Sequence, residues 1–576
     1  MSWKNVYEEW ANEKDLDQQL KSQLEALKED PAALEDAFYA PLEFGTAGMR
    51  GVLGPGINRM NIYAVRQATE GLALFMDQQD VKTKKRGVAI AYDSRHHSQE
   101  FAMEAAKVLA YHDIPAFVFE ELRPTPELSF AVRYLHTFTG IMITASHNPP
   151  QYNGYKVYGE DGGQMPPADA DRVTSLIRQI KNPLAIPVIT AEKAKEKDLL
   201  TIIGENVDQA YLAEVKNVTI DQQVIDKMGD QLKLVYTPLH GTGKMLAEKA
   251  LTQAGFTQFI IEPEQGIADP DFTTVKSPNP EEASAFEHSI ALGKKEGADL
   301  LVATDPDADR LGAAVRMPDG EYQVLTGNQI GAILIRYILE ARKKTQTLAE
   351  NAVILKSIVS SELSTEIAKS YGVPVVNVLT GFKFIAEKIK EYEKDQSHTF
   401  VFGFEESYGF LVQPFVRDKD AIQTLVLLAE VAAAYKQKGQ TLYDALEEIF
   451  TEYGHYAEKT VSVTMSGQEG SSKIAALMKK FREAAPKDFA GRFIVTTEDF
   501  KTQLRHKQDG TTEKMAMPAA DVLKYFLEDD SWIAVRPSGT EPKIKFYIGV
   551  NAPSDGQAQQ KISCFENAIN EFIGEK

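Results

Sequence analysis

The chain has 576 residues and a mass of 63.9 kDa, with 43% apolar and 25% charged residues. Its length exceeds that of one ordinary domain, and its composition is that of a folded globular protein. The net charge of −20 gives no general attraction to nucleic acid or anionic membranes, so any bound phosphate must be held by local clusters of basic groups. A single cysteine, Cys564, excludes an intrachain disulfide framework and a cysteine-rich metal site.

The start of the chain and its long apolar stretches lack the patterns of export or membrane insertion. Residues 1–40 are charged and helical in pattern, without an apolar signal core, and we expect one or two surface helices there. The stretch at 421–435 is interrupted by Gln423 and Glu430 and is too short to span a bilayer. We therefore expect a cytoplasmic protein with no membrane or nucleic-acid partner, and the sequence indicates no obligate protein partner.

Short β-branched runs alternate with helical periodicity from residue 87 onward. Residues 87–92 and 114–120 are typical of buried strands. Between them, Ser98 is a candidate N-cap for a helix with Phe101 and Leu109 on one face. This alternation predicts parallel sheets covered by helices.

Three segments repeat one form, an apolar strand that runs directly into a loop of polar residues. They are GIMITASHN (140–148), DLLVATDPDADR (299–310) and TFVFGFEESYG (399–409). Open α/β sheets bind ligands at the carboxyl ends of their strands, so we expect three α/β units, each with one functional loop. The last part of the chain has an α+β pattern and predicts a smaller domain. The expected domains are 1–205, 206–325, 326–453 and 454–576.

Asp305, Asp307 and Asp309 follow a predicted strand at alternate positions, which makes an oxygen-rich site suited to Mg²⁺. An EF-hand is excluded, because Arg310 and Arg316 stand where that loop needs Gly and Glu. A solvated acidic turn is the simplest alternative. A second alternative is a Mg²⁺ phosphatase with Asp305 as nucleophile, although Asp309 stands where haloacid-dehalogenase phosphatases carry Thr or Val.

Ser146 lies in the loop 144–150, next to His147. A serine hydroxyl is a poor nucleophile and needs a base or a metal to react. No Gly-x-Ser-x-Gly elbow surrounds it, which weakens the case for a hydrolase. A turn with a capping serine is an equally simple interpretation, and a second turn downstream could return Lys156 toward the serine.

Two glycine-containing loops are candidate phosphate sites. The loop 536–543 combines a guanidinium, two hydroxyls and glycine amides, all of which suit a phosphate dianion. The loop 44–51 ends in Arg50 but is not a Walker A sequence, because no Gly-Lys-Ser/Thr follows. Each loop could also be a plain turn.

Two further loops carry groups that could read sugar hydroxyls. Glu405, Glu406 and Ser407 follow the third repeated strand and can accept and donate hydrogen bonds. Thr380 and Gly381 form a similar small polar segment after a strand. A solvated loop is an equally good interpretation of either segment alone.

The motifs TASHNPP, DPDADR, FEESYG and RPSGTEPK, in this order and preceded by FGTAGMRG, resemble the active-site loops of the α-D-phosphohexomutase family. The resemblance extends from about residue 40 to 560 and is closest to the long bacterial phosphoglucomutases of that family. It implies three related α/β domains with mixed sheets plus a smaller C-terminal α+β domain, arranged around a central cleft.

The resemblance also implies roles for individual residues. Ser146 matches the family's phosphoserine, whose phosphoryl oxygen would complete a Mg²⁺ site made by Asp305, Asp307 and Asp309. Residues that match positions around the transferring phosphoryl group are Arg50, His147 and Lys156. Residues that match substrate-contacting positions are Thr46, Arg310, Thr380, Gly381, Glu405, Ser407, Lys419, Arg536, Ser538, Gly539 and Thr540.

The implied reaction interconverts glucose 1-phosphate and glucose 6-phosphate through a phosphoserine and a bound sugar bisphosphate, with Mg²⁺ as cofactor and sugar 1,6-bisphosphate as activator. The partner is therefore a phosphorylated sugar. Either Lys156 or His147 would be the general base, and the roles of Lys543 and Lys545 stay open. Alternatives are phosphomannomutase or phosphopentomutase activity, a Mg²⁺-dependent sugar phosphatase, or a non-catalytic sugar-phosphate sensor.

Overall fold

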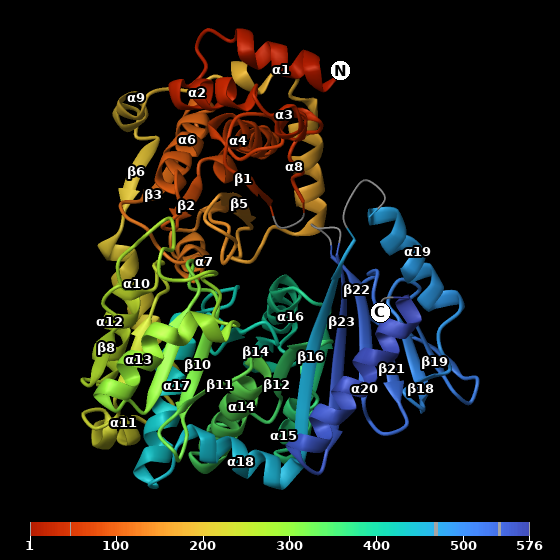
Figure 1. Cartoon of the computed structure of the whole chain (residues 1–576). Helices are drawn as coiled ribbons and strands as arrows, with labels where there is room; N and C mark the ends of the chain where they lie inside the picture. The colour runs from red at the N-terminus through yellow and green to blue at the C-terminus, as the bar shows by residue number, and fades with distance from the viewer. Residues whose placement is uncertain (1, 46–47, 466–469, 539–542, 575–576) are drawn as a thin grey trace. The chain divides into compact units, whose positions relative to one another are not determined.

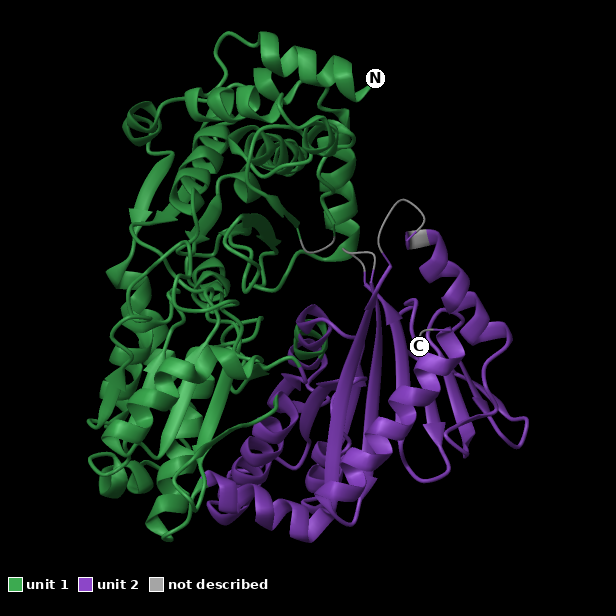
Figure 2. Cartoon of the chain, in the orientation of Figure 1, with its two compact units in different colours: residues 1–326, 386–391, 407–441 green, residues 327–385, 392–406, 442–576 purple. Residues whose placement is uncertain are grey.

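The computed structural model describes residues 2–45, 48–465, 470–538 and 543–574. The chain divides into two compact units (Figure 2). Unit 1 comprises residues 1–326, 386–391 and 407–441, and unit 2 comprises residues 327–385, 392–406 and 442–576. Over the described ranges, no helix is both long enough and apolar enough to cross a membrane.

Unit 1 begins with a small helical layer (Figure 1). Its helices are α1 (Trp3–Asn12), α2 (Gln18–Leu27) and α3 (Pro31–Phe38). The side chains of Asp17 and Asp30 accept hydrogen bonds from the first amides of α2 and α3, and so start both helices. Trp10 and Phe38 pack with Tyr63 in an apolar cluster. The expectation of one or two surface helices is therefore wrong in number, because residues 3–38 form three helices, which share a buried apolar cluster.

The first sheet has the strand order β1-β5-β4-β2-β3-β6. Its strands are β1 (Met49–Val52), β2 (Val88–Tyr92), β3 (Ala116–Phe119), β4 (Thr139–Ile143), β5 (Tyr152–Tyr158) and β6 (Leu200–Ile203). Strands β4, β2, β3 and β6 are parallel, whereas β5 is antiparallel to both β4 and β1. Because β2 and β4 are parallel neighbours, the loops that follow them start at the same edge of the sheet.

Helices of the first sheet follow the predicted alternation. They are α4 (Ile62–Asp77), α5 (Val81–Lys84), α6 (Ser98–Tyr111), α7 (Thr125–Tyr134), α8 (Pro167–Gln179) and α9 (Ala191–Glu196). Phe101 and Leu109 of α6 are buried, as predicted. Ser98 is not the cap, however, because His97 holds that position and the Ser98 hydroxyl donates to Asp93 instead.

The second sheet of unit 1 has the order β11-β10-β9-β7-β8. Its strands are β7 (Leu234–Thr237), β8 (Phe259–Ile261), β9 (Leu300–Thr304), β10 (Leu311–Arg316) and β11 (Tyr322–Val324). The other elements of this part of unit 1 are α10 (Glu205–Val215), α11 (Gln222–Met228), α12 (Lys244–Ala254), α13 (Glu287–Glu296), β15 (Gly409–Leu411) and α17 (Ala421–Gln437). Like β4 and β5, strands β9 and β10 form an antiparallel pair joined by a polar loop.

Helix α17 contains the apolar stretch 421–435 and is buried in the protein core. Its carboxylate Glu430 is wholly buried and accepts hydrogen bonds from the amides of Ile220 and Asp221. A buried charge needs such partners. The polar residues in this stretch therefore connect α17 to its neighbours inside the protein.

Unit 2 begins with parallel strands, in which β12 (Ala352–Ser357) pairs with both β13 (Val375–Val378) and β14 (Thr399–Glu405). The helices nearby in the chain are α14 (Gly327–Lys344), α15 (Leu363–Ser370), α16 (Phe382–Asp395) and α18 (Leu442–Tyr453). The third repeated motif thus ends β14, just as the first two motifs end β4 and β9.

The C-terminal sheet has the order β16-β23-β22-β21-β18-β19-β20, with β17 paired to β18. Its strands are β16 (His455–Thr464), β17 (Asp488–Phe489), β18 (Arg492–Asp499), β19 (Leu504–Lys507), β20 (Thr512–Lys514), β21 (Leu523–Leu527), β22 (Trp532–Pro537) and β23 (Lys543–Ala552). The strand pairs of this sheet are antiparallel over the described residues, and helices α19 (Gly470–Glu483) and α20 (Asp555–Ile573) pack on the sheet. The predicted α/β class with an α+β C-terminal part is confirmed, whereas the central cleft stays a prediction.

The two sheets of unit 2 share a buried cluster. Ile358 and Leu379, which follow β12 and β13, belong to one apolar cluster with Trp532 and Tyr547 of the C-terminal sheet. Lys524 of β21 is buried beside it and donates from Nζ to the carbonyl of Ile358 over 2.7 Å. Apolar burial and a desolvated hydrogen bond thus join the two sheets.

Candidate active site

Ser146 lies in the loop after β4, in a left-handed backbone conformation with φ of 50°. Its amide donates to Thr144 Oγ1, and its side chain is almost buried, with 8% of the residue exposed. Gly154, in the antiparallel strand β5, passes close behind this loop. A Cβ atom there would lie 2.6 Å from the carbonyl oxygen of Thr144, so only glycine fits.

The Ser146 hydroxyl contacts both an acid and an imidazole. Ser146 Oγ donates to Asp305 Oδ2 over 2.6 Å, and it lies 3.1 Å from His147 Nδ1. Asp305 follows β9, so loops at the ends of β4 and β9, both within unit 1, bring the two sequence motifs together. The expected proximity of these motifs is therefore observed.

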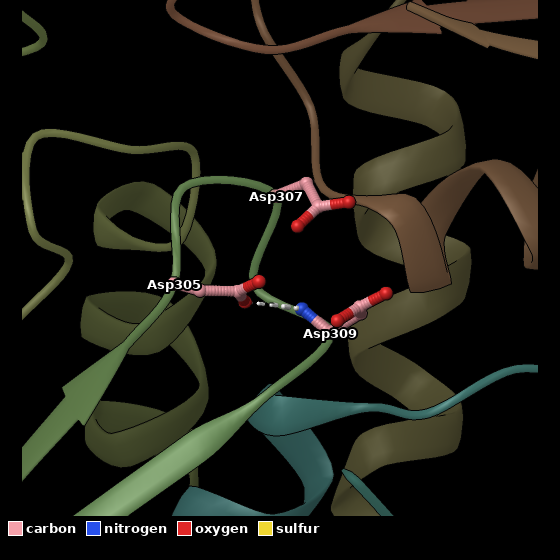
Figure 3. Close-up of side chains that lie close together, drawn as sticks. All are labelled: Asp305, Asp307 and Asp309. Carbon is pink, nitrogen blue, oxygen red and sulfur yellow. Dashed lines mark hydrogen bonds between the residues drawn. The ribbon is translucent and has the colours of Figure 1, made fainter. Parts of the chain in front are cut away.

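The three aspartates form a compact buried cluster in the loop between β9 and β10 (Figure 3). One carboxylate oxygen from each of Asp305, Asp307 and Asp309 lies within 4.8 Å of the others, and over the described residues this is the one such cluster of potential metal ligands. Asp305 Oδ1 accepts from the amides of Asp309 and Arg310, which fixes the loop. Thr125, the first residue of α7, donates from Oγ1 to Asp307 Oδ2 over 2.9 Å.

The donor set fits a hard divalent cation such as Mg²⁺. Asp307 Oδ1 and Asp309 Oδ1 are buried, and neither has a hydrogen-bond partner in the described part of the chain. Burial and the neighbouring carboxylates raise the pKa of Asp305 and Asp309. At Asp307 burial acts in the same direction, but the charge of Lys156 and the hydrogen bonds from Asp305, Lys156 and Thr125 together outweigh it, so the net pKa is lowered. A cation would relieve this repulsion and bind the two unpartnered oxygens.

Two ammonium groups partly balance the carboxylates. Lys156 Nζ, from β5, lies 2.9 Å from Asp307 Oδ2 and 3.8 Å from Asp309 Oδ2. Lys419 Nζ lies 3.0 Å from Asp309 Oδ2. Burial lowers the pKa of Lys156, but the attraction of Asp307 and Asp309 outweighs it, so the net pKa is raised. Lys156 is therefore held as an ammonium beside the serine loop.

His147 has the opposite character. Burial lowers its pKa well below the ordinary value, and the positive charge of Arg310 lowers it further. The ring is therefore neutral at physiological pH and can accept a proton. Lys156 and His147 thus remain two distinct candidates for proton transfer.

Two arginines with expected roles also lie in unit 1: Arg50, near the transferring group, and Arg310, a substrate contact. Arg50 of β1 donates from Nη1 to Asn148 Oδ1 in the serine loop over 2.7 Å. Arg310 follows the aspartate cluster and donates from Nη1 to the carbonyl of Ser407 over 3.0 Å. Arg50 thus contacts the loop of Ser146, and Lys419 contacts the aspartate loop. Ser407 reaches the aspartate loop through Arg310.

The remaining expected substrate residues belong to unit 2 or lie outside the described residues. Glu405, at the end of β14, accepts from the amide of Gly381 over 2.6 Å, and Thr380 Oγ1 is buried nearby in the chain. Arg536 and Ser538 lie at and just beyond the end of β22. Residues outside the described ranges are Thr46, Gly539 and Thr540.

Lys545, whose role the sequence left open, stands directly opposite Arg536 in the antiparallel pair β22–β23. Lys543 lies two residues before Lys545 in β23 and so on the same face of the strand. The carbonyl of Lys543 accepts from the Ser538 amide over 2.8 Å. Side chains of directly opposed residues leave the sheet on the same side. Lys545 therefore adds positive charge beside Arg536.

Sequence reasoning missed a set of residues that support the site. Tyr158 donates to Asp418 Oδ2 over 2.9 Å, and Asp418 Oδ1 in turn accepts from Lys419 Nζ. Thr125 contacts Asp307, as described above, and Arg95 contacts the serine loop. Arg95 follows the buried strand β2 in the same way as the predicted residues follow their strands, so the same signal could have found it.

Comparison with protein families matches the chain to the phosphoglucomutase/phosphomannomutase family. The matches are alpha/beta/alpha domain I at residues 41–184, alpha/beta/alpha domain II at 209–318, alpha/beta/alpha domain III at 326–453 and the C-terminal domain at 492–561. Two similar curated proteins are a phosphoglucomutase of Staphylococcus haemolyticus (strain JCSC1435) and one of Staphylococcus aureus (strain USA300). Each is 40% identical over 92% of this chain, which corresponds to 94% and 93% of those proteins, respectively.

Solved structures share the fold. A phosphoglucomutase/phosphomannomutase family protein from Burkholderia thailandensis has a TM-score of 0.64 at 18% identity, over 92% of this chain and 97% of that chain. The open form of parafusin, a phosphoglucomutase from Paramecium, has a TM-score of 0.67 at 17% identity, over 93% and 96% of the two chains. Family matches in all four parts of the chain, together with relatives 40% identical over 92% of its length, establish that it belongs to the phosphoglucomutase/phosphomannomutase family, as its motifs predicted.

Proposed function

We propose that this chain is a phosphoglucomutase that interconverts glucose 1-phosphate and glucose 6-phosphate through phosphorylated Ser146. The curated relatives named phosphoglucomutase, at 40% identity over most of the chain, support this activity. The observation that carries the mechanism is the 2.6 Å hydrogen bond from Ser146 Oγ to Asp305 Oδ2, within a buried cluster of three carboxylates. A metal-binding cluster beside a serine is what phosphoryl exchange at that serine needs.

Asp305, Asp307 and Asp309 are the residues that would hold Mg²⁺. When bound there, the cation supplies positive charge that offsets the negative charge developing on the serine oxygen and on the phosphoryl group. The chain's own residues add to this charge. Arg50 and Arg310 are placed by their contacts with Asn148 and Ser407, where their guanidinium groups can bind phosphoryl oxygens.

Phosphoryl transfer begins on phosphorylated Ser146. The free hydroxyl oxygen of the bound sugar attacks phosphorus, the bond from phosphorus to Ser146 Oγ breaks, and the sugar becomes a 1,6-bisphosphate. The sugar then turns over and returns its other phosphoryl group to Ser146, so the enzyme regains its starting state. A sugar 1,6-bisphosphate also phosphorylates the free serine, which explains its role as activator.

The attacking hydroxyl must lose a proton. Neutral His147 can accept it directly, whereas Lys156, held as an ammonium, must first release a proton of its own. His147 Nδ1 lies 3.1 Å from Ser146 Oγ, and Lys156 Nζ lies beside Asp307. The replacements His147→Asn and Lys156→Met distinguish them. Loss of the proton-transferring group is expected to lower kcat by roughly 10²–10⁴-fold, and the other replacement by less.

The recognition groups in this proposal follow the motif matches of the sequence. Arg536, Ser538, Gly539 and Thr540 bind the phosphate that is not reacting, while Glu405 and Ser407 bind ring hydroxyls. Both sets must accept the sugar in two orientations, so the phosphate loop must recognise phosphate and not the ring. The buried position of Glu405 at the end of β14, and its hydrogen bond from Gly381, support a fixed acceptor for hydroxyl groups.

The test is a panel of glucose, mannose and pentose 1-phosphates, assayed with Mg²⁺ and a trace of glucose 1,6-bisphosphate. Conversion of glucose 1-phosphate faster than the other substrates supports the proposal, and preference for another sugar reassigns the substrate within the family. Release of inorganic phosphate would instead indicate a phosphatase, and binding without turnover a sensor. A cytoplasmic location and the lack of an obligate partner stay predictions from the sequence.

A further inference from the structure

Arg95 is a buried cation that the proposed reaction does not yet use. It lies in the loop after β2, and β2 is the parallel neighbour of β4, which leads to Ser146. Its side chain has no exposed surface. A guanidinium that is fully removed from water must be held by several acceptors, so its contacts show what it does in the fold.

The guanidinium of Arg95 binds the backbone of the serine loop at four points. Nη1 donates to the carbonyls of Pro149 and Tyr152, each over 2.9 Å. Nη2 donates to the carbonyl of Ser146 over 2.5 Å and to that of Asn148. One side chain thus satisfies carbonyl groups from Ser146 to Tyr152, over the segment that turns the chain from β4 into β5.

Other residues fix the guanidinium in its own position. Asp93 Oδ2 lies 3.5 Å from Arg95 Nε, and Asp93 Oδ1 accepts from the Arg95 amide and from the Ser98 hydroxyl. The guanidinium carbon also lies 4.9 Å from the ring centroid of Phe272. The aromatic face and the carboxylate hold the planar group, so its donors point at the loop.

We propose that Arg95 is a positioning residue that holds the loop 146–152 in the conformation in which Ser146 faces the aspartate cluster. The left-handed backbone of Ser146 is unusual for a residue with a side chain and persists only where surrounding contacts enforce it. Arg95 supplies such contacts at the carbonyl of Ser146 itself. It touches neither the hydroxyl nor the aspartates by any of these bonds, so it acts through the loop.

This inference rests on the proposed function for its effect on turnover. A misplaced serine oxygen slows phosphoryl transfer, but substrate binding by other residues is unaffected. Replacement of Arg95 should therefore lower kcat and leave KM nearly unchanged. The order of the loop is a second consequence, and it does not depend on which sugar the enzyme uses.

The test is Arg95→Lys in the full-length chain, because lysine keeps the charge but cannot reach four carbonyls with a planar fork. We expect kcat to fall roughly 10²-fold, as for a displacement of about 1 Å, with KM changed by less than about threefold. Amide hydrogen exchange within residues 144–154 should become faster. The matched control is Arg66→Lys. Arg66 lies on α4 and pairs with Glu104 of α6, and its replacement should alter neither measurement.

Each outcome decides the inference. Unchanged kcat and unchanged exchange, or a lower thermal midpoint with normal kcat per folded enzyme, would overturn it. If Arg95→Lys does not fold, Phe272→Leu replaces it, and the same but smaller changes in kcat and exchange are expected. If the wild-type chain fails to convert glucose 1-phosphate, the proposed function fails, whereas the exchange of residues 144–154 still tests the role of Arg95.

Discussion

Ser146 Oγ and Asp305 Oδ2 are 2.6 Å apart, although the two residues are separated by 159 positions in the chain. Ser146 lies in the polar loop between β4 and β5, and Asp305 begins the loop after β9. A phosphoryl group on Ser146 would therefore lie against the same carboxylate cluster that suits Mg²⁺.

Replacement of the serine should abolish the mutase reaction. Ser146→Ala removes the oxygen that carries the phosphoryl group, and the buried methyl group should leave the fold intact. The measurements are turnover of glucose 1-phosphate and mass spectrometry of residue 146 after incubation with glucose 1,6-bisphosphate. Ser175→Ala, on an exposed face of α8, is the control and should retain both signals. Wild-type turnover by Ser146→Ala would exclude the phosphoserine mechanism.

Removal of one carboxylate charge should weaken metal binding. Asp307→Asn should raise the Mg²⁺ concentration for half-maximal activity by about tenfold or more, equivalent to ~1.4 kcal/mol. Because a bound ion stabilises the folded state, Mg²⁺ should also raise the thermal midpoint of the wild type more than that of the variant. The control is Asp271→Asn, whose exposed carboxylate pairs with His96. An equal Mg²⁺-induced shift in wild type and Asp307→Asn would show that Asp307 does not bind the metal.

Loss of Arg536 should weaken substrate binding. A charge-assisted contact to phosphate contributes roughly 1.5–3 kcal/mol, so Arg536→Ala should raise KM by roughly 10–150-fold. Steady-state kinetics with glucose 1-phosphate measures the effect. Arg492→Ala changes a half-exposed arginine of β18 and serves as the control. If KM rises equally in both variants, the effect reports general charge and not a phosphate site.

Glu458 should make stability depend on pH. This residue of β16 accepts from Asn328 Nδ2, and burial raises its pKa to about 7, although hydrogen bonds from Ser361 and Asn328 oppose the shift. A raised pKa means that the folded state favours the protonated acid. The stabilisation is therefore complete below the unfolded pKa of 4.5 and is lost as the pH rises to about 7.

The measurement for Glu458 is denaturant unfolding of wild type and Glu458→Gln between pH 4.5 and 8. The uncharged variant should gain stability relative to wild type as the pH rises through this range. Glu483→Gln, an exposed change on α19, should give no such trend. A constant difference between Glu458→Gln and wild type across the pH range would contradict the assignment.

Lys524 should be important for the stability of unit 2. Its ammonium donates to the Ile358 carbonyl and to Glu362, and it lies 4.4 Å from the ring centroid of Trp532. Lys524→Ala removes this donor from the buried carbonyl of Ile358, which costs about 1–3 kcal/mol, whereas Glu362 keeps its ion pair with Lys356. Denaturant unfolding should show this loss, whereas Lys514→Ala, at an exposed position of β20, should change stability by less than about 0.5 kcal/mol. Equal stability of the two variants would refute the role of Lys524.

The sequence was most informative about strands and the loops that follow them. Strands predicted at 87–92 and 114–120 are observed as β2 and β3, since short β-branched runs need no long-range information. The N-terminal helices were undercounted, although Asp17 and Asp30 are ordinary helix caps. Ser98 is a plausible N-cap in the sequence but binds Asp93 instead. The sequence does not distinguish a serine that caps a helix from one that binds an acid elsewhere.

The core of the site was predictable for the same reason. Ser146 and the three aspartates each follow an apolar strand, and family resemblance joined the two motifs. Arg95, Thr125 and Tyr158 could not be assigned roles, because their partners depend on which strands are neighbours in a sheet and on how α7 meets the loop after β9. The pKa directions of His147 and Lys156 likewise depend on burial, which no local pattern encodes.

The apolar cluster shared by Ile358, Leu379, Trp532 and Tyr547 has a mechanical consequence. The chain segments that carry Glu405 and Arg536 belong to sheets joined by this cluster and by Lys524. We therefore expect the spacing between the Glu405 carboxylate and the Arg536 guanidinium to be fixed. A sugar bisphosphate that turns over between the two phosphoryl transfers must fit this spacing in both orientations. We therefore expect conversion only of sugars that place ring hydroxyls at a similar distance from the non-reacting phosphate in both orientations.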